Sequence, residues 1–260
     1  MCTVVVLFRP GHDWPLLFAA NRDEMAGRPW RAPGRHWPTH PDVVGGLDEL
    51  AGGTWMGLNG KGVVAAILNR PGTLGPKAGF ASRGDLPLMA LDHATAAEAA
   101  AGLGGRDASL WRPFNLLLAD STAAFWARWD GMDLGVQAIP PGLAMLTAHD
   151  LNDTAASVRM RRYRPRFEAA SVPDPERGDW RSWQDLLASR ETDGGPHGAM
   201  TVAMADGFGT VCSSLLGLPA KGAPVWLFSA GRPGEVPWRE VGIADDPLHA
   251  VPSILGRREG

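Results

Sequence analysis

Apolar and turn-forming segments alternate through the first third of the chain. Two apolar, β-branched or aromatic runs, residues 3–8 and 16–21, are separated by a segment rich in Gly, Pro and Asp. They predict two strands joined as a hairpin, which would bring Cys2 close to the end of the second strand. A further apolar stretch, residues 52–69, contains an Asn-Gly pair at 59–60, which is typical of a tight turn between two more strands.

The spacing of hydrophobic positions changes after residue 80, from a pattern typical of strands to one typical of a helix. Residues 82–103 are rich in Ala and Leu and predict a helix, and Ser82 with Asp85 three positions later resembles a capping box. Beyond it, the pattern predicts strands, then helices, then strands again. These are strands at 114–120 and 123–130, helices at 153–170 (broken or kinked near Pro165) and 179–190, and strands at 200–206, 210–218 and 224–231.

The order of these elements indicates a fold class. Strands and helices come in groups, with hairpins instead of regular βαβ units. This order favours an α+β fold in which two antiparallel sheets stack and helices cover them. We expect a single domain over residues 1–260, because no internal repeat or long linker interrupts the chain. No Gly-rich phosphate-binding motif follows a strand, so no motif indicates a nucleotide-binding fold.

Composition narrows the class further. Hydrophobic residues make up 45% of the chain and charged residues 20%, which suits a large buried core. The formal net charge is -3 without a long basic run, so nucleic acid is not expected as a partner. No apolar run reaches the roughly 18 residues of a spanning helix, and we expect a soluble cytoplasmic protein without a membrane span. The two cysteines make no disulfide framework, and no cluster has metal-ligand spacing.

Cys2 directly follows the initiator methionine, and this position has two interpretations. It can be a chance occurrence. Alternatively, removal of Met1 would leave a thiol and a free α-amine on one residue. The amine, with an ordinary pKa of about 7.7–8.0, would be the nearest base for the proton of the thiol. Cys212, by contrast, is expected to be a small buried hydrophobe in a strand.

Residues 19–24 (AANRDE) place four polar side chains in a row after a strand. Such a row is common where a strand end turns into solvent. It could also serve the thiol, with Arg22 lowering its pKa and Asp23 orienting the amine by a charge-assisted hydrogen bond. Because side chains alternate along a strand, Arg22 and Glu24 share one face, and Asn21 and Asp23 share the other. Only one of these faces can meet Cys2 directly unless the strand has ended.

Two further residues, Asn69 and Trp55, lie where they could contact a substrate. Asn69 ends the predicted strand in ILNRPG, where its amide could donate a hydrogen bond to a developing oxyanion or simply form a turn. Trp55, within GGTWMG, suits either a pocket wall or plain strand packing.

Taken in order, these motifs resemble the NRDE family, also called the transport and Golgi organisation 2 family. The segments that carry the resemblance extend to about residue 120, and they are MC at the start, AANRDE, GGTWMGLNGKG, LNRPG, SRGDL and FNLLLAD. The resemblance implies a relationship to the N-terminal nucleophile (Ntn) hydrolases and a four-layer αββα sandwich. That architecture agrees with the stacked sheets predicted from the pattern.

The resemblance also implies roles for particular residues. Ntn relatives such as penicillin V acylase and bile salt hydrolase begin Met-Cys and carry an Arg-Asn-x-Asp stretch after their second strand. Asp23 and Asn21 match their Asp and Asn, whereas Arg22 falls out of register with their Arg. Their oxyanion Asn lies in a strand-end Leu-Asn stretch, which matches Asn69. Near the C-terminus the family often shows Tyr-Gly-Thr-Arg, whereas this chain has FGTVC, with Val211 at the Arg position.

The residues and the resemblance together define a predicted site without a metal. A further Asn of the relatives corresponds to either Asn152 or His149. The residues assigned to catalysis are Cys2, Arg22, Asp23 and Asn69, and those assigned to substrate binding are Asn21, Glu24, Trp55, His149 and Asn152.

Three functional hypotheses follow. The first is an Ntn-type cysteine amidohydrolase or acyltransferase that needs no cofactor, in which Cys2 attacks a small amide or acyl thioester after Met1 removal. The second, implied by the resemblance, is non-catalytic haem binding or trafficking, with Trp rings against the porphyrin and a ligand such as His36, His40, His149 or the Cys2 thiolate. The third is a non-catalytic relative that binds an acyl-CoA-like or other small ligand.

Overall fold

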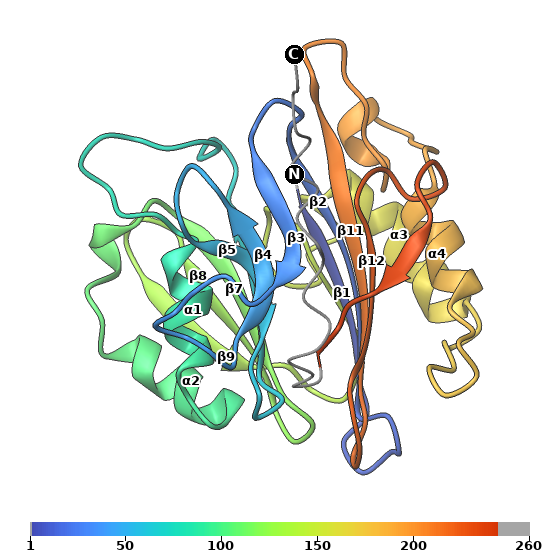
Figure 1. Cartoon of the computed structure of the whole chain (residues 1–260). Helices are drawn as coiled ribbons and strands as arrows, with labels where there is room; N and C mark the ends of the chain where they lie inside the picture. Colours follow the sequence, from blue (N-terminus) through green and yellow to red (C-terminus); the bar gives the residue numbers. More distant parts are fainter. Residues whose placement is uncertain (1, 244–260) are drawn as a thin grey trace, which may run out of the picture.

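The computed structural model describes residues 2–243, which form two antiparallel sheets flanked by helices (Figure 1). The strands of the first sheet, in spatial order, are β10 (Gly142–Leu146), β1 (Thr3–Phe8), β2 (Leu16–Met25), β11 (Phe208–Leu218), β12 (Val225–Ser229) and β13 (Trp238–Glu240). The second sheet contains β3 (Trp30–Gly34), β4 (Val44–Asp48), β5 (Thr54–Leu58), β6 (Val64–Asn69), β7 (Phe114–Ala119), β8 (Ala124–Trp129) and β9 (Leu134–Ala138). The α-helices are α1 (Asp85–Leu91), α2 (Ala96–Gly104), α3 (Val158–Ala169) and α4 (Arg181–Ala188).

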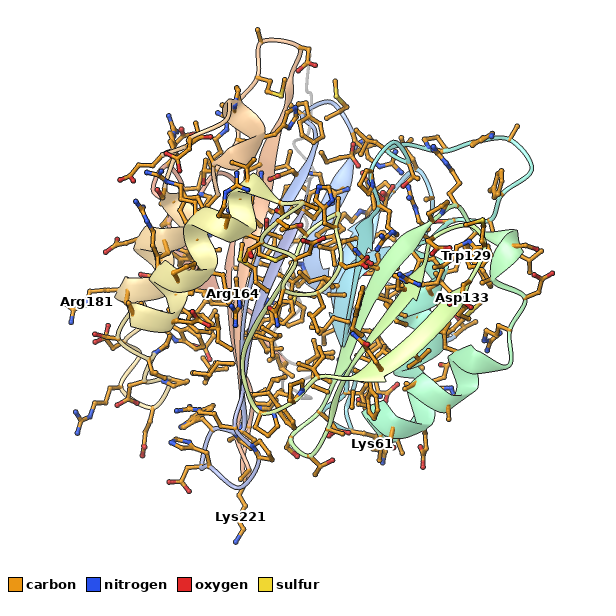
Figure 2. The ribbon with its side chains drawn as sticks, turned by 180° about the vertical axis from the view of Figure 1, so that it is seen from behind. Lys61, Trp129, Asp133, Arg164, Arg181 and Lys221 are labelled. Carbon is orange, nitrogen blue, oxygen red and sulfur yellow. The ribbon has the colours of Figure 1, made fainter. Side chains whose placement is uncertain are left out.

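Side-chain alternation along the strands builds three hydrophobic cores. Val4 of β1 points between the sheets and packs in one core with Leu68 of β6. Val5 points the other way and packs with Met160 of α3, while Ala65 of β6 joins the core beneath α1 and α2. Strands buried on both faces read as near-continuous apolar runs. The layers are therefore helix, sheet, sheet and helix, and the predicted αββα sandwich is confirmed; Figure 2 shows it from behind.

The predicted helix at 82–103 is in fact two helices. α1 and α2 are separated by residues 92–95. The predicted capping box at Ser82 is wrong, because the N-cap of α1 is Gly84, which has no side-chain cap, and the Ser82 hydroxyl accepts from the Gly84 N–H at 3.1 Å. The side-chain cap belongs to α2, where the Thr95 hydroxyl accepts from the Glu98 N–H at 3.1 Å.

Residues 200–206 do not form the predicted strand. Their backbone groups bond elsewhere: the Thr201 N–H donates to the Ser189 carbonyl after α4, and the Val202 N–H donates to the Thr210 hydroxyl. α3 runs through Pro165 as one assigned helix, so the predicted break is absent. The pattern also missed short strands, most of them partly exposed, which give a weak alternation signal; these are β3, β4, β9, β10 and β13.

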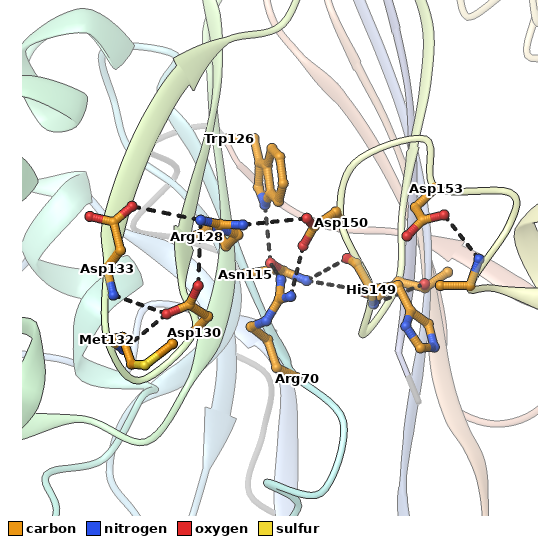
Figure 3. A network of polar contacts seen from close by, with 12 residues as sticks. Arg70, Asn115, Trp126, Arg128, Asp130, Met132, Asp133, His149, Asp150 and Asp153 are labelled. Carbon is orange, nitrogen blue, oxygen red and sulfur yellow. Dashed lines mark hydrogen bonds and ion pairs between the residues drawn. The ribbon is translucent and has the colours of Figure 1, made fainter.

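A buried amide joins the two sheets. Asn115 of β7 is fully buried, and its Nδ2 donates to the carbonyls of Thr147 at 2.9 Å and His149 at 2.8 Å, which follow β10 of the other sheet (Figure 3). Its Oδ1 accepts from Arg70 Nη1 at 2.8 Å and from Trp126 Nε1 at 3.1 Å. All the polar atoms of this amide are therefore satisfied by partners from both sheets.

The same network holds the end of β6. Arg70, directly after Asn69, also pairs with Asp150 at 2.7 Å, and Arg128 of β8 reaches Asp150 at 3.5 Å (Figure 3). Position 70 is thus tied to β7 and to the loop after β10, which limits how far Asn69 can move relative to the first sheet.

Removing this amide should destabilise the protein. We expect Asn115→Ala to lower the free energy of unfolding by about 2–4 kcal/mol, because it removes four hydrogen bonds and leaves buried groups without partners. Urea unfolding followed by Trp fluorescence measures this. Asp133→Asn is the control, because Asp133 is 74% exposed at the rim of the network and its loss should cost under about 0.5 kcal/mol. Equal effects of the two variants would contradict the interpretation.

Candidate active site

Cys2 lies immediately before β1, beside Arg22 of β2. Thr3 pairs with Asn21 in this antiparallel ladder, so the next position outward sets Cys2 beside Arg22. The thiol lies 3.6 Å from the backbone oxygen of Asp23 and packs against the core between the sheets. The face of β2 that meets Cys2 is therefore the face of Arg22 and Glu24, one of the two that alternation allowed.

A cavity of about 310 Å³ opens beside Cys2. Its walls come from Cys2 and β2, from β4 and β5, from the end of β6, and from the loop that leads into α1. Its lining includes four of the residues predicted for catalysis and two of those predicted for substrate binding, namely Cys2, Arg22, Asp23, Asn69, Glu24 and Trp55.

Burial raises the pKa of the Cys2 thiol. Desolvation is the largest cause, and the positive charge of Arg22 acts in the opposite direction without overcoming it. The thiol is therefore protonated at neutral pH, and a nucleophilic reaction needs a base that removes the proton. Cys212 of β11 is fully buried on the other side of Arg22, and burial raises the pKa of its thiol to about 12, as expected for an inert structural cysteine.

Arg22 is held between an aromatic ring and a carboxylate. Its guanidinium carbon lies 4.3 Å from the centroid of the Trp55 ring, and Nη2 lies 3.6 Å from Asp48. The residue is 6% exposed, and Nη1 has no hydrogen-bond partner. Among the described residues, this donor is therefore an unsatisfied polar group within the wall of the cavity beside Cys2.

Asp23 lies on the opposite face of β2, where it is fully buried. Its Oδ1 accepts from the Thr210 hydroxyl at 2.7 Å, and its Oδ2 accepts from Arg159 Nη1 at 3.1 Å. Arg159 Nη1 also donates to the Thr3 hydroxyl at 2.6 Å. A β-bulge at Val211 separates Thr210, which pairs with Asp23, from the residue that pairs with Arg22.

Asn21 shares the face of Asp23 and is also buried. Its amide donates to the carbonyls of Leu187 at 3.0 Å and Met200 at 2.9 Å, and its oxygen accepts from the Ser213 hydroxyl at 2.7 Å. The amide thus joins the sheet to the end of α4. It does not line the cavity, and its role in substrate binding stays a prediction.

Sequence analysis did not single out Arg159, although a signal was present. Met160, Tyr163 and Phe167 form the buried stripe of α3. Arg159 lies four positions before Tyr163, so helical periodicity places it on the buried edge of the same stripe. A buried arginine needs an anionic partner, and Asp23 is that partner.

Asn69 lies at the boundary of two cavities. It ends β6 and lines both the cavity beside Cys2 and a second cavity of about 260 Å³. The second cavity has a mainly apolar wall that includes Met25, Leu74, Met204 and Phe208. An amide at this boundary can donate to an atom of a molecule bound next to Cys2.

His149 and Asn152 do not line the cavity beside Cys2. Asn152 has a left-handed backbone, with φ of 58°, and its side-chain oxygen accepts from the Met145 N–H at 2.8 Å, as is typical of a turn-forming residue. The carbonyl of His149 accepts from Asn115. The structure does not bring these two residues together with Cys2, and their role in substrate binding stays a prediction.

Arg83 and Arg112, which sequence analysis also missed, line the outer wall of the cavity. Arg83 donates to the carbonyls of Thr73 at 2.8 Å and Pro113 at 3.0 Å, and Arg112 donates to that of Gly75 at 2.7 Å. They thereby hold the loop after β6 against the start of β7. No periodic pattern marks arginines in such Gly- and Pro-rich loops.

Within residues 2–243, no group of three or more His, Cys, Asp and Glu side chains is placed to hold a metal ion. The same residues contain no helix with the length and apolar character needed to cross a membrane.

Comparison with solved structures defines the class of fold. A C2A mutant of conjugated bile acid hydrolase from Clostridium perfringens matches with a TM-score of 0.57 over 94% of both chains at 12% identity. The N-acylethanolamine-hydrolyzing acid amidase orthologue of Caenorhabditis elegans matches with a TM-score of 0.52, at 14% identity, over 84% of this chain and 94% of its own. At these identities the likeness shows the fold alone, which is that of the Ntn hydrolases.

The family follows from the sequence profile of Transport and Golgi organisation 2, which matches residues 1–171. The chain therefore belongs to the Transport and Golgi organisation 2 family. The Transport and Golgi organization protein 2 homologue of Bos taurus is 33% identical over 132 residues, and that of Homo sapiens is 30% identical over 133 residues. These alignments cover 47% and 48% of this chain and 46% and 47% of the relatives, so the chain matches about half the length of each relative.

The buried Asp23–Arg159 pair predicts a large stability effect. We expect Arg159→Met to lower the free energy of unfolding by about 3–5 kcal/mol, because it removes the Arg159 cation from beside the buried Asp23 carboxylate. Arg161→Met is the matched control on the exposed side of the same helix and should have little effect. Thermal and urea unfolding would measure both variants, and a small effect at Arg159 would argue against a paired, buried charge.

The raised pKa of Cys2 predicts slow alkylation near neutral pH. In a pH series with iodoacetamide, read by intact mass, the rate at Cys2 should rise with a midpoint above that of free cysteine in the same buffers. Arg22→Gln should move the midpoint higher, because the cation that favours the thiolate is removed. Cys212→Ala should leave the profile unchanged. A midpoint below that of free cysteine would refute the effect of burial.

Proposed function

We propose that the protein is an Ntn-type cysteine amidohydrolase or acyltransferase that acts on a small amide or acyl thioester through Cys2 after Met1 removal. The observation that carries the proposal is that Cys2, Arg22 and Asn69, from three separate segments of the chain, line one cavity. The fold is shared with hydrolases whose names describe acyl cleavage, among them the penicillin V acylase from Agrobacterium tumefaciens, at a TM-score of 0.50, 14% identity and 88% coverage of this chain and 83% of its own. This likeness supports the proposal without assigning a substrate.

The first step forms an acyl-enzyme. The α-amine of the processed Cys2 takes the thiol proton, and the sulfur attacks the carbonyl carbon of the substrate. The carbon–nitrogen bond of an amide, or the carbon–sulfur bond of a thioester, then breaks, and the ammonium group returns the proton to the leaving group. In the second step, water or an acceptor attacks the Cys2 thioester and releases the acyl group and the free thiol.

Each neighbouring residue has a distinct proposed task. Asn69 donates a hydrogen bond to the oxygen that becomes negative as the carbonyl is attacked. Arg22 favours the thiolate by its charge, which offsets part of the effect of burial. Asp23, held in one orientation by Arg159 and Thr210, orients the amine through the strand end that bears Cys2. Trp55 and Glu24 line the path to the thiol.

The residues around Cys2 do not fit haem. Among the residues that the structure describes, no histidine lines the cavity, and the raised pKa of Cys2 disfavours the thiolate that would be an axial ligand. Haem handling stays a prediction.

Intact mass spectrometry tests the proposal on the untagged protein. We expect the mass to lack Met1, and brief exposure to a reactive acyl thioester should add one acyl group. Cys2→Ala should abolish that addition. Retention of Met1, or acylation that persists in Cys2→Ala, would refute the proposal.

The role of Asn69 is tested by rate. Asn69→Ala should slow acylation by about 10²–10³-fold, the effect of removing one oxyanion donor. Gln137→Ala, which removes an exposed amide of β9, is the control and should acylate at the unaltered rate. Equal rates in both variants would remove Asn69 from the mechanism while leaving Cys2 in place.

A further inference from the structure

The cavity beside Cys2 carries an excess of positive charge. Five cationic residues line it, against three acidic ones, of which Asp23 directs its carboxylate to the opposite face of β2. The cationic residues are Arg22, Arg28, Lys77, Arg83 and Arg112, and the acidic ones are Asp23, Glu24 and Asp48.

Cations on the inner side of the cavity already engage the acidic residues. Asp48 pairs with Arg28 at 2.7 Å and lies 3.6 Å from Arg22, and Glu24 lies 3.9 Å from Arg28. Asp23 is neutralised from behind the sheet by Arg159 at 3.1 Å. Within residues 2–243, no carboxylate pairs with the cations of the outer wall.

The outer wall consists of Arg83, Arg112 and Lys77. The two arginines donate to carbonyl groups of the loop after β6, and Arg83 also donates to the Thr73 hydroxyl at 2.8 Å, so all these acceptors are neutral. Burial, together with the charge of nearby Arg112, lowers the pKa of Arg83 to about 10. Lys77 is exposed, and its ammonium lies 5.4 Å from the centroid of the Phe80 ring.

The inner side contributes an unused donor. Arg22 Nη1 has no hydrogen-bond partner although the residue is 6% exposed. A buried donor without a partner is costly, and an acceptor brought by a ligand would remove that cost. Because a guanidinium is a charged donor, an anionic acceptor satisfies it best.

We propose that this cavity is a binding site for an organic anion, with Arg22 Nη1 and the cationic wall of Lys77, Arg83 and Arg112 recognising a carboxylate or phosphate group. The inference rests on the proposed function in one respect, because it makes the substrate an acyl compound that carries such a group. Electrostatic attraction from the wall would draw the anion in, and the Arg22 donor would hold it next to Cys2.

Binding can be measured without turnover. Calorimetric titration of the full-length Cys2→Ala protein with succinate, with inorganic phosphate and with uncharged succinamide compares two anions with a neutral molecule of similar shape. We expect at least one of the two anions to bind. Succinamide should bind at least about tenfold more weakly than that anion. Affinity for the anion should fall about tenfold between about 20 mM and about 500 mM NaCl, because salt screens the attraction. Preference between succinate and phosphate identifies the group that the site takes.

Charge-removing variants locate the site. Lys77→Gln should weaken anion binding by about three- to tenfold, and it breaks no hydrogen bond of the loop. Arg112→Gln should weaken it further. Lys221→Gln is the matched control, because Lys221 is an exposed lysine in the turn between β11 and β12 (Figure 2) and does not line the cavity, and it should leave binding unchanged.

The outcomes separate this inference from the proposed function. Anion binding without acylation of Cys2 would support the anion site and refute the acyl chemistry. Acylation with equal binding of succinate and succinamide, or with no effect of Lys77→Gln beyond that of Lys221→Gln, would refute the anion site and leave the acyl chemistry standing.

Discussion

The two-residue alternation of β2 is the constraint on which the candidate site depends. Adjacent residues in this strand point to opposite faces, so Arg22 enters the space between the sheets while Asp23 enters the layer beneath the helices. Neighbouring residues of β2 therefore face two different environments. The inner environment holds the thiol, an aromatic ring and a cation, and the outer one holds a carboxylate in a closed set of hydrogen bonds. A shift of one residue in the register of β1 and β2 would exchange these roles.

The charges of the site are arranged as pairs and as unpaired cations. Asp23 with Arg159 and Asp48 with Arg28 form pairs that stabilise the framework around the cavity. Arg83 and Arg112 instead hold a loop through neutral carbonyl groups and keep their charge available. The residues that stabilise the walls of the cavity are thus different from those proposed to bind the ligand, although both groups surround the Cys2 sulfur.

Local patterns predicted much of the fold. The apolar runs at 3–8 and 114–120 gave the correct strands, because strands buried on both faces leave a strong and continuous signal. The stretch at 200–206 has the same apolar character but bonds to α4 and β11, and composition cannot reveal such tertiary partners. Exposed strands such as β9 and β13 depend on pairing with a neighbour, which no local window contains.

The site was predictable where its residues belong to one hairpin or one strand end. Cys2 precedes β1, Arg22 lies within β2 and Asn69 ends β6, and all three line one cavity in the structure. Arg159 lies 136 positions from its partner Asp23, so only the buried stripe of α3 could have indicated it. Arg83 and Arg112 lie in loops whose path is set by the hydrogen bonds that these arginines make. Their location at the cavity therefore could not be predicted from the sequence pattern.

The bulge at Val211 has a consequence for variation within the family. A bulged residue lies outside the alternating ladder, so a change at this position shifts neither Thr210 toward Asp23 nor Cys212 toward Arg22. Selection on the residue at 211 can therefore proceed independently of selection on the framework.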